Sequence, residues 1–303
     1  MTFRILTSEF AGVILPGRMI TPPGKAWEPN QVVCKVVQEE INVPETIRRL
    51  SEQLLAIKKP QVNGKTFHYR QANVTSDGIE LEVGCSRYQF NLLHTAFEER
   101  IRQEHPEIAE TLLQYVREED LFDYGKLGGP LSSGVGITTV VVLADRLTIM
   151  VHRSKEVSVN ADIDHPALGE GVNPDEGESG EIDIAAVAIR AAVEELNLPI
   201  SGKDLIYLGL AVDGRYWWPG NLTKVEVPLT WEEIKERSEG ATDRWERSDI
   251  RFIPYTPDGI AEELRYAMEP GRGVTGFGSM ALLQSGIYDF GRAAMDAAFR
   301  SLS

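Results

Sequence analysis

The sequence contains little cysteine and carries an excess of negative charge. Only two of its 303 residues are cysteines, Cys34 and Cys85, and they lie far apart. Two ordinary thiols in a cytoplasmic protein are the more common interpretation of such a pair, while a disulfide between them stays open. The formal net charge of −15 argues against a general nucleic-acid surface or an anionic-membrane surface. It leaves room for a small anionic ligand that a divalent cation bridges to the protein.

Long apolar runs and several well-known motifs are also absent. No run approaches the length of a membrane span, and the start of the chain, MTFRILTSEF, lacks the features of a signal peptide. We therefore expect a cytoplasmic protein without a membrane partner. The chain has no G-x-S-x-G motif, no P-loop, no C-x-x-C pair and no metal-ligand spacing among its histidines. Residues 271–276 match G-x-G-x-x-G, but no strand precedes them as a dinucleotide site requires, so we interpret them as a flexible loop.

The first part of the chain carries secondary-structure signals but no recognisable catalytic motif. Periodicity predicts helices at 44–57, 88–104 and 106–116, and strands at 31–37, 66–72 and 79–83. Residues 118–135 are rich in turn formers and lose this periodicity, so we place a domain boundary there. We expect an N-terminal α+β domain, residues 1–127. A scaffold, a homodimer interface and a lid over the second domain are the roles left open for it.

The second part of the chain, residues 128–303, alternates strand and helix signals. Strands are predicted at 136–143, 147–152, 205–212, 222–227 and 250–254, and helices at 231–239 and 277–299, the latter as one helix or a pair. Residues 157–180 are acidic, rich in glycine and without periodicity, so we expect a loop there. Together the two parts predict a protein of the α+β class.

Residues 177–198, GESGEIDIAAVAIRAAVEELNL, combine an acidic loop with a helix. Asp183 is placed to cap the start of the helix, and Asn197 lies where a left-handed end is plausible. Arg190 and Glu194 are one turn apart and can pair, with Glu195 beside them. The apolar residues at helical spacing should face a core; they are Ile182, Ile189, Val193 and Leu196. Carboxylates arranged in this way suit a hard divalent cation.

This stretch resembles the Nudix box, the loop–helix motif of the Nudix hydrolases. The positions that match the pattern are Arg190, Ala192, Glu194, Glu195 and Leu198. Ala191 stands where the family has its first helix Glu, Asn197 replaces a Gly, and the upstream loop does not fit the family spacing. The order of elements from Gly136 onward is similar to the Nudix fold, which implies an α/β/α sandwich in residues 128–303.

By this resemblance, the expected function is Mg²⁺- or Mn²⁺-dependent hydrolysis of a nucleoside diphosphate linked to another group. The resemblance implies that Glu194 and Glu195 hold the metal and that Arg190 orients a carboxylate. Because Ala191 replaces a Glu that serves many relatives, the base has to come from elsewhere, and Glu170 and Glu246 are the best candidates. The alternative is a degenerate Nudix domain that binds a nucleotide-like ligand or a protein without turnover.

Further site residues are each open to a second interpretation. Glu170 either folds back to complete the metal site or belongs to a solvated acidic loop. Asp243, like Glu246, follows the Nudix-like stretch in the chain and could supply a further carboxylate to the metal site. Arg153, at the end of a strand, is either a phosphate contact or a solvent-exposed side chain. In the loop at 213–220, Trp217 or Trp218 either stacks on a base of a small nucleotide-like substrate or packs into the core.

Overall fold

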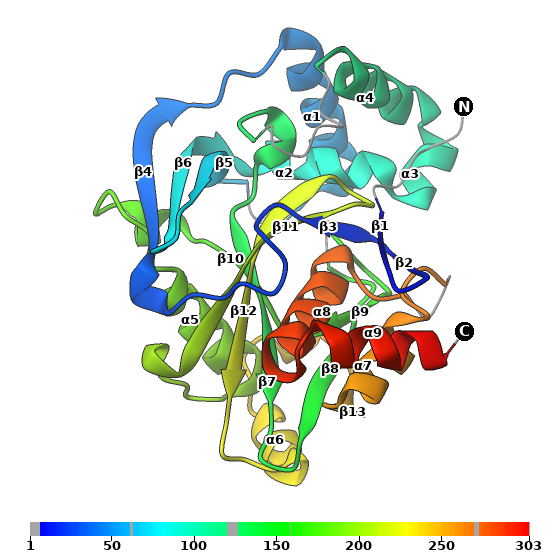
Figure 1. The fold of residues 1–303 in the computed structure, drawn as a ribbon. Coiled ribbons are helices and arrows are strands. Elements are labelled where there is room, and N and C mark those ends of the chain that lie inside the picture. The colour runs from blue at the N-terminus through cyan, green and yellow to red at the C-terminus, as the bar shows by residue number, and fades with distance from the viewer. Residues whose placement is uncertain (1–6, 61–62, 120–126, 158, 270–272, 303) are drawn as a thin grey trace.

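The computed structural model describes residues 7–60, 63–119, 127–157, 159–269 and 273–302. Helices and strands both contribute substantially, and the protein belongs to the α+β class, as the sequence predicted. Figure 1 shows a large twisted sheet in the C-terminal part of the chain, with a smaller sheet and a group of helices from the N-terminal part above it. The first two residues of the G-x-G-x-x-G match at 271–276 lie outside the described residues.

The smaller sheet contains three strands in the order β4-β6-β5, with β4 parallel to β6 and β5 antiparallel to it. Its strands are β4 (Val32–Glu40), β5 (Lys65–Val74) and β6 (Ile79–Arg87). The helices beside it are α1 (Glu45–Lys58), α2 (Tyr88–Asn91), α3 (Glu99–Glu104) and α4 (Pro106–Glu118). The single helix predicted at 88–104 is wrong, because a 3-10 segment at Leu92–Phe97 separates α2 from α3. Cys34 and Cys85 are both free thiols.

The central sheet runs in the order β13-β8-β7-β12-β11-β3, with β9 paired to β8 and β10 paired to β7. Its strands are β3 (Gly17–Met19), β7 (Gly136–Val142), β8 (Leu147–Arg153), β9 (Asp164–Pro166), β10 (Leu168–Gly171), β11 (Leu205–Asp213), β12 (Trp218–Glu226) and β13 (Arg247–Pro254). Only β7 and β12 are parallel to each other among these pairs. The short strands β9 and β10 lie within 157–180, so the expectation of a plain loop there is wrong.

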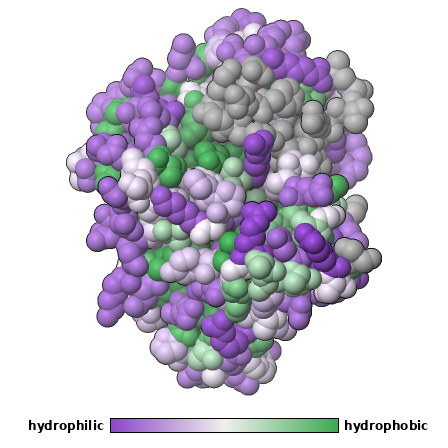
Figure 2. Space-filling model, viewed as in Figure 1, coloured by the Kyte–Doolittle hydropathy of each residue, from purple (hydrophilic) through white to green (hydrophobic). Residues whose placement is uncertain are grey.

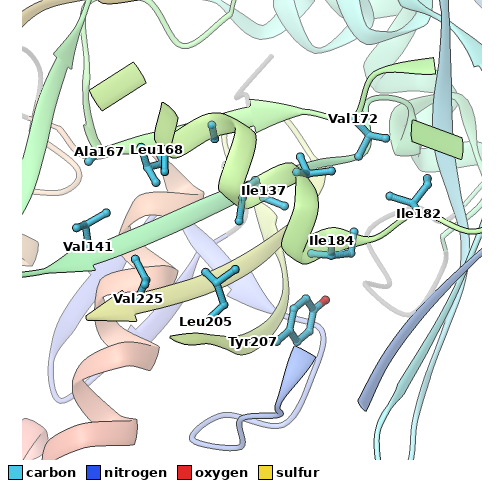
Figure 3. Close-up of a cluster of buried hydrophobic side chains, with 14 of the residues drawn as sticks. Ile137, Val141, Ala167, Leu168, Val172, Ile182, Ile184, Leu205, Tyr207 and Val225 are labelled. Atoms are coloured by element: carbon cyan, nitrogen blue, oxygen red, sulfur yellow. The ribbon is translucent and has the colours of Figure 1, made fainter. Parts of the chain in front are cut away.

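Helices cover both faces of this sheet and give three layers. One face carries α5 (Ile184–Leu196) and α6 (Trp231–Ser238), and the other carries α7 (Pro257–Leu264), α8 (Gly276–Phe290) and α9 (Arg292–Ser301). Alternate residues of β7 point to the two opposite helical layers. Ile137 and Val141 pack with α5, as Figure 3 shows, while Val140 and Val142 pack with α8. The period of two along the strand therefore supplies both cores.

The boundary expected at residues 127 and 128 does not separate the strands of the central sheet. Strand β3, from the start of the chain, pairs with β11. Phe10 and Leu15, from the strands β1 (Ser8–Phe10) and β2 (Val13–Leu15), pack into the core beneath α8. A fragment that begins near Gly134 would lack these elements and would have an incomplete core. Three-residue strands carry too little periodicity for the sequence to predict such long-range pairing.

The surface is predominantly polar on the face shown in Figure 2, with hydrophobic residues in small groups between charged ones. Among the described residues, the large hydrophobic side chains that remain exposed are Ile14, Val193, Trp231, Trp245 and Tyr288. No helix in the described ranges combines the length and the apolar character needed to cross a membrane.

Candidate functional site

The helix of the Nudix-like stretch, α5, begins and ends where the sequence predicted. The Asp183 carboxylate accepts hydrogen bonds from the backbone N–H groups of Ala185 and Ala186, and Asn197 adopts a left-handed φ of 52°. The predicted apolar stripe is partly wrong, because Val193 is 46% exposed. The side chains that α5 buries are instead Ile184, Val187, Ala188, Ala191, Ala192, Glu195 and Leu196. Three of these buried side chains are alanines that pack in the same core as β7, so the inward face of α5 is the alanine-rich one and not the one that carries Val193.

Strand β10 brings Glu170 to the same region. Glu170 lies opposite Ile137 of β7, and its side chain is half-buried. The sequence did not predict this strand, since two of its four residues are glycines and a strand this short shows no clear alternation. Glu170 thus lies on a strand beside Arg190 and Glu194, rather than in a solvated loop.

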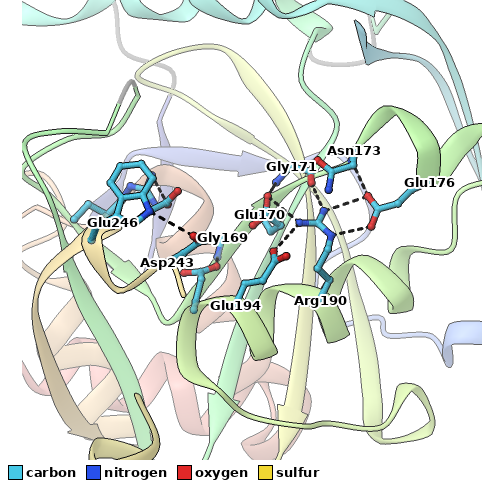
Figure 4. Close-up of polar contacts among 12 residues, drawn as sticks. Gly169, Glu170, Gly171, Asn173, Glu176, Arg190, Glu194, Asp243 and Glu246 are labelled. Atoms are coloured by element: carbon cyan, nitrogen blue, oxygen red, sulfur yellow. Dashed lines mark hydrogen bonds and ion pairs between the residues drawn. The ribbon is translucent and has the colours of Figure 1, made fainter. Parts of the chain in front are cut away.

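Arg190 is the centre of the polar cluster in Figure 4. Its guanidinium donates from Nε to Glu176 Oε1 at 2.9 Å and from Nη1 to Glu194 Oε2 at 3.0 Å, and Nη1 lies 3.4 Å from Glu170 Oε1. Nη2 also donates to the carbonyl oxygen of Gly171 at 2.7 Å. One cation thus ties α5 to β10 and to the short helix at Pro174–Gly177 that carries Glu176. The predicted Arg190–Glu194 pair is confirmed.

Three carboxylates converge next to Arg190. One oxygen each from Glu170, Glu194 and Asp243 lie within 4.8 Å of one another. The Asp243 backbone N–H donates to the Glu194 carbonyl oxygen at 2.9 Å, which fixes the late loop against the end of α5. Burial raises the pKa of Glu170 against the opposing effect of Arg190, and the Glu246 and Glu194 charges raise it further. These three carboxylate oxygens could together hold a metal ion.

Glu195 does not belong to this group of three, so its assignment as a metal ligand needs correction. The side chain is only 7% exposed, and its Oε1 accepts a hydrogen bond from the Gly169 backbone N–H at 2.9 Å. Burial raises the pKa of Glu195 to about 8, and the charges of Glu170 and Glu246 add to this effect. Glu195 faces inward because it lies one turn after Ala191 on the buried side of α5. Its hydrogen bond holds the backbone of β10 next to Glu170.

Arg153 and Glu246 form the neighbouring part of the site. The Arg153 side chain is 15% exposed, so it is not a simple solvent-exposed residue, and its Nη2 lies 3.8 Å from Glu246 Oε2. The buried Nε of Arg153 has no hydrogen-bond partner among the described residues. Burial raises the pKa of Glu246, against the opposing effect of Arg153, and the Asp243 and Glu194 charges raise it further. Arg153 is therefore held beside Glu246 with a buried Nε–H that has no described partner.

Of the two adjacent tryptophans, Trp217 is buried and Trp218 is partly buried, and both rings pack on other aromatic side chains rather than standing free for a substrate. Trp217 is 5% exposed, and its ring centroid lies 6.2 Å from that of Phe97. Trp218 stacks on His94 with centroids 4.9 Å apart, and its Nε1 donates to the Gly134 carbonyl oxygen at 2.7 Å. Both rings already have partners, as the alternative interpretation of core packing requires.

Glu176 is the site residue that the sequence analysis missed. It accepts the Arg190 hydrogen bonds described above, and its Oε2 also accepts from the Asn173 backbone N–H at 2.6 Å. Asn173 and Glu176 form a reciprocal capping box around the short helix. The spacing of Asn, Pro and a Glu three residues after the Asn was a signal that could have identified this turn.

Comparisons with known proteins add little to this geometry. No family model matches the chain, and no curated protein matches it. Among solved structures, the chain is similar to DR0079 from Deinococcus radiodurans, with a TM-score of 0.31, 13% sequence identity, and coverage of 44% of this chain and 72% of that chain. A similarity of this size supports no conclusion about function, which has to be inferred from the side chains of the site.

Proposed function

We propose that this protein hydrolyses the diphosphate bond of a nucleoside diphosphate linked to another group, with the help of Mg²⁺ or Mn²⁺. The observation that carries the proposal is the convergence of Glu170, Glu194 and Asp243 within 4.8 Å, from three separate segments, beside Arg190. The substrate would be a small nucleotide-like molecule, and the enzyme would act in the cytoplasm. The net charge of −15 is compatible with such a substrate if a cation bridges its phosphates to the carboxylates.

Glu170, Glu194 and Asp243 would hold the ion. A divalent cation at such a site neutralises phosphate charge and lowers the pKa of a bound water. Arg190 contributes by fixing the positions of Glu170 and Glu194, since it contacts both carboxylates. Glu195 contributes by holding the Gly169 backbone, and with it the start of β10, in place.

Glu246 and Arg153 would act on the substrate side of the same site. Glu170 belongs to the group of three oxygens, so Glu246 is the better of the two sequence-predicted bases for taking a proton from water. Its raised pKa brings it closer to the range in which a carboxylate exchanges protons near neutral pH. Arg153, whose side chain is 15% exposed beside Glu246, would donate from its guanidinium to a phosphate oxygen.

A binding module without turnover is the second candidate, and Ala191 favours it. Ala191 is fully buried against the sheet, so a carboxylate at that position would enter the core rather than the site. The carboxylate that many Nudix enzymes use is therefore missing here, and Glu195, one turn later on the same helical face, is occupied by the Gly169 backbone N–H. Under this second function, the cluster would retain the cation and the ligand but would lack an effective base.

Turnover by the full-length chain decides between the two functions. Nucleotide sugars, dinucleotides and nucleoside triphosphates would be incubated with Mg²⁺ or Mn²⁺, and the released phosphate compounds separated by chromatography. We expect cleavage of at least one diphosphate-containing compound, lost on addition of a chelator and in the Glu194→Gln variant. Ligand binding without cleavage across the panel would favour the binding module. Equal cleavage by the Glu194→Gln variant would overturn the proposed site.

A further inference from the structure

Trp245 differs from the other tryptophans in having an open ring. The other four rings each pack against an aromatic neighbour: Trp27 on Tyr207, Trp217 on Phe97, Trp218 on His94 and Trp231 on Phe252. Trp245 is 50% exposed, and within the described ranges no aromatic or cationic side chain packs on its ring. A single exposed indole is unremarkable by itself. Trp245 differs from the exposed residues Ile14 and Tyr288 because it lies next to the carboxylates of the candidate site.

Trp245 borders the carboxylate group directly. It lies in the short 3-10 helix at Arg244–Glu246, between Asp243 and Glu246. Its Nε1 donates to Asp243 Oδ1 at 3.4 Å, so the polar edge of the indole points toward the candidate cation site. A hydrogen bond in the plane of the ring leaves both ring faces free of that bond. The segment is anchored at both ends, by Asp243 N–H to the Glu194 carbonyl and by Ser154 N–H to the Glu246 carbonyl at 2.8 Å.

We propose that the Trp245 indole is the surface on which the base of a nucleoside diphosphate stacks. This inference rests on the proposed function. It assigns a binding surface to the base, whereas the carboxylates would bind the diphosphate through a cation. A base is separated from its diphosphate only by a sugar, so a flat ring beside the phosphate site suits it. Stacking uses the π-face that every base has, so Trp245 favours nucleosides as a class over inorganic phosphates and discriminates weakly between bases.

Binding measurements on the full-length protein with Mn²⁺ test the inference without relying on turnover. The probes are ADP, GDP, UDP and CDP, with inorganic pyrophosphate as the probe that has a diphosphate but no base. We expect Trp245→Ala to weaken binding of the nucleoside diphosphates by about 10- to 100-fold, the range for loss of one base–aromatic stack. Pyrophosphate binding should be unchanged, and Trp245→Phe should retain most of the nucleoside affinity because it keeps a flat ring.

Two controls separate stacking from other effects of the substitution. Mn²⁺ affinity should be the same in Trp245→Ala and wild type, since backbone hydrogen bonds still hold Asp243. Tyr288→Ala removes a comparably exposed ring, 44% exposed, on α8 at the other face of the sheet, and should leave all binding unchanged.

The outcomes distinguish the two levels of the proposal. Wild-type binding of pyrophosphate as tight as that of every nucleoside diphosphate, or an equal loss for both in Trp245→Ala, would overturn the role of Trp245 and leave the diphosphate site standing. Absence of binding to all five probes would overturn the proposed function, and the role of Trp245 with it.

Discussion

Arg190 and Lys224 lie on opposite faces of the central sheet, and each contacts more than one carboxylate. Lys224 Nζ lies 2.7 Å from Glu226 Oε1 and 2.6 Å from Asp289 Oδ2, and its side chain is only 3% exposed. Asp289 Oδ2 also accepts a hydrogen bond from the Tyr255 hydroxyl at 2.7 Å, so this half-buried carboxylate has two donors. The Lys224 cluster is therefore well compensated around its buried members, although it lines a cavity of about 310 Å³.

The Arg190 cluster differs because it gathers four carboxylates around one cation. Arg190 contacts Glu170, Glu176 and Glu194, and Asp243 adds another charge within 4.8 Å of two of them. Asp243 itself has only a long indole N–H contact at 3.4 Å as a side-chain donor among those described. We infer from this difference that the Lys224 cluster stabilises the fold. The Arg190 cluster instead carries an excess of negative charge, which a bound cation would neutralise. Each cluster can be tested against the other.

The largest expected effect is the loss of stability when the buried lysine is removed. Lys224→Met leaves Asp289, whose side chain is 14% exposed, without its cation. Removing one partner of a buried ion pair costs about 3–5 kcal/mol in the free energy of unfolding. Urea denaturation followed by circular dichroism would measure the loss, and added Mn²⁺ should not restore it.

Arg190→Met provides the matched variant in the same experiment. We expect a smaller loss of stability than in Lys224→Met, because the Arg190 side chain is 21% exposed and its carboxylates are more accessible to water. Mn²⁺ should restore part of this loss, since a cation that binds the native state stabilises it. An identical response of the two variants to Mn²⁺ would refute the distinction between the clusters.

The next effect in size concerns catalysis. Glu170→Gln should reduce turnover of the best diphosphate substrate by about 10²-fold, or roughly 2.7 kcal/mol, because it removes a charged oxygen from the group of three. Glu226→Gln changes a carboxylate of the Lys224 cluster that is 58% exposed, and it should leave turnover unchanged. Steady-state kinetics of both variants decide the matter. A comparable loss in the two would mean that the effect is not specific to the Arg190 face.

A pH-dependent loss of stability is expected from the α8 face. His165 is buried next to Thr275, and burial lowers its pKa from 6.5 to about 3. Between these two values the unfolded chain binds the proton more readily than the native protein does, so stability is present above pH 6.5 and falls as the pH falls. From pH 6.5 to pH 5 the contribution of His165 should decrease by about 2 kcal/mol.

Denaturation curves at several pH values, with His165→Gln as the comparison, check this expectation. The variant should show a weaker dependence on pH, and Mn²⁺ should not alter the difference between the two proteins. His68 and His94, whose pKa burial lowers to about 4, retain part of the dependence in both proteins. A variant as sensitive to pH as wild type would show that His165 is protonated equally in the folded and unfolded states.

The sequence predicted local features of α5 well, because they depend on neighbouring residues. The cap at Asp183, the left-handed end at Asn197 and the Arg190–Glu194 pair all follow from spacings of a few residues. The helix period alone could not decide which side chains lie inward. Val193 was expected in the core and is exposed, whereas Glu195 was expected at the site and is buried. The packing of the alanine-rich face of α5 in the core shared with the sheet leaves Val193 outside and Glu195 inside.

Long-range contacts were the part of the site and fold that the sequence could not predict. Asp243 reaches Glu194 through a backbone hydrogen bond between residues far apart in the chain. The backbone of β4 pairs in the same way with the loop before α5, where Val36 N–H donates to the Gly180 carbonyl at 2.8 Å. No local pattern encodes these pairings. The loop that leads into α5 is therefore bonded to the N-terminal part of the chain, for which a separate domain was predicted.

The smallest expected effect separates the adjacent residues Glu194 and Glu195. Calorimetry with Mn²⁺ should show about tenfold weaker binding, or 1.4 kcal/mol, for Glu194→Gln, because a charged oxygen of the converging group is lost.

Glu195→Gln should weaken Mn²⁺ binding by only about threefold or less, well under 1 kcal/mol. The amide oxygen can still accept the hydrogen bond from Gly169 N–H, and Glu195 is not one of the three converging carboxylates. Glu195→Met removes that hydrogen bond and releases the start of β10, so it should weaken binding by roughly tenfold, the scale for loss of a group that orients a metal ligand. Equal losses for Glu194→Gln and Glu195→Gln would instead mean that both carboxylates face the ion, and that the buried position of Glu195 changes when the metal binds.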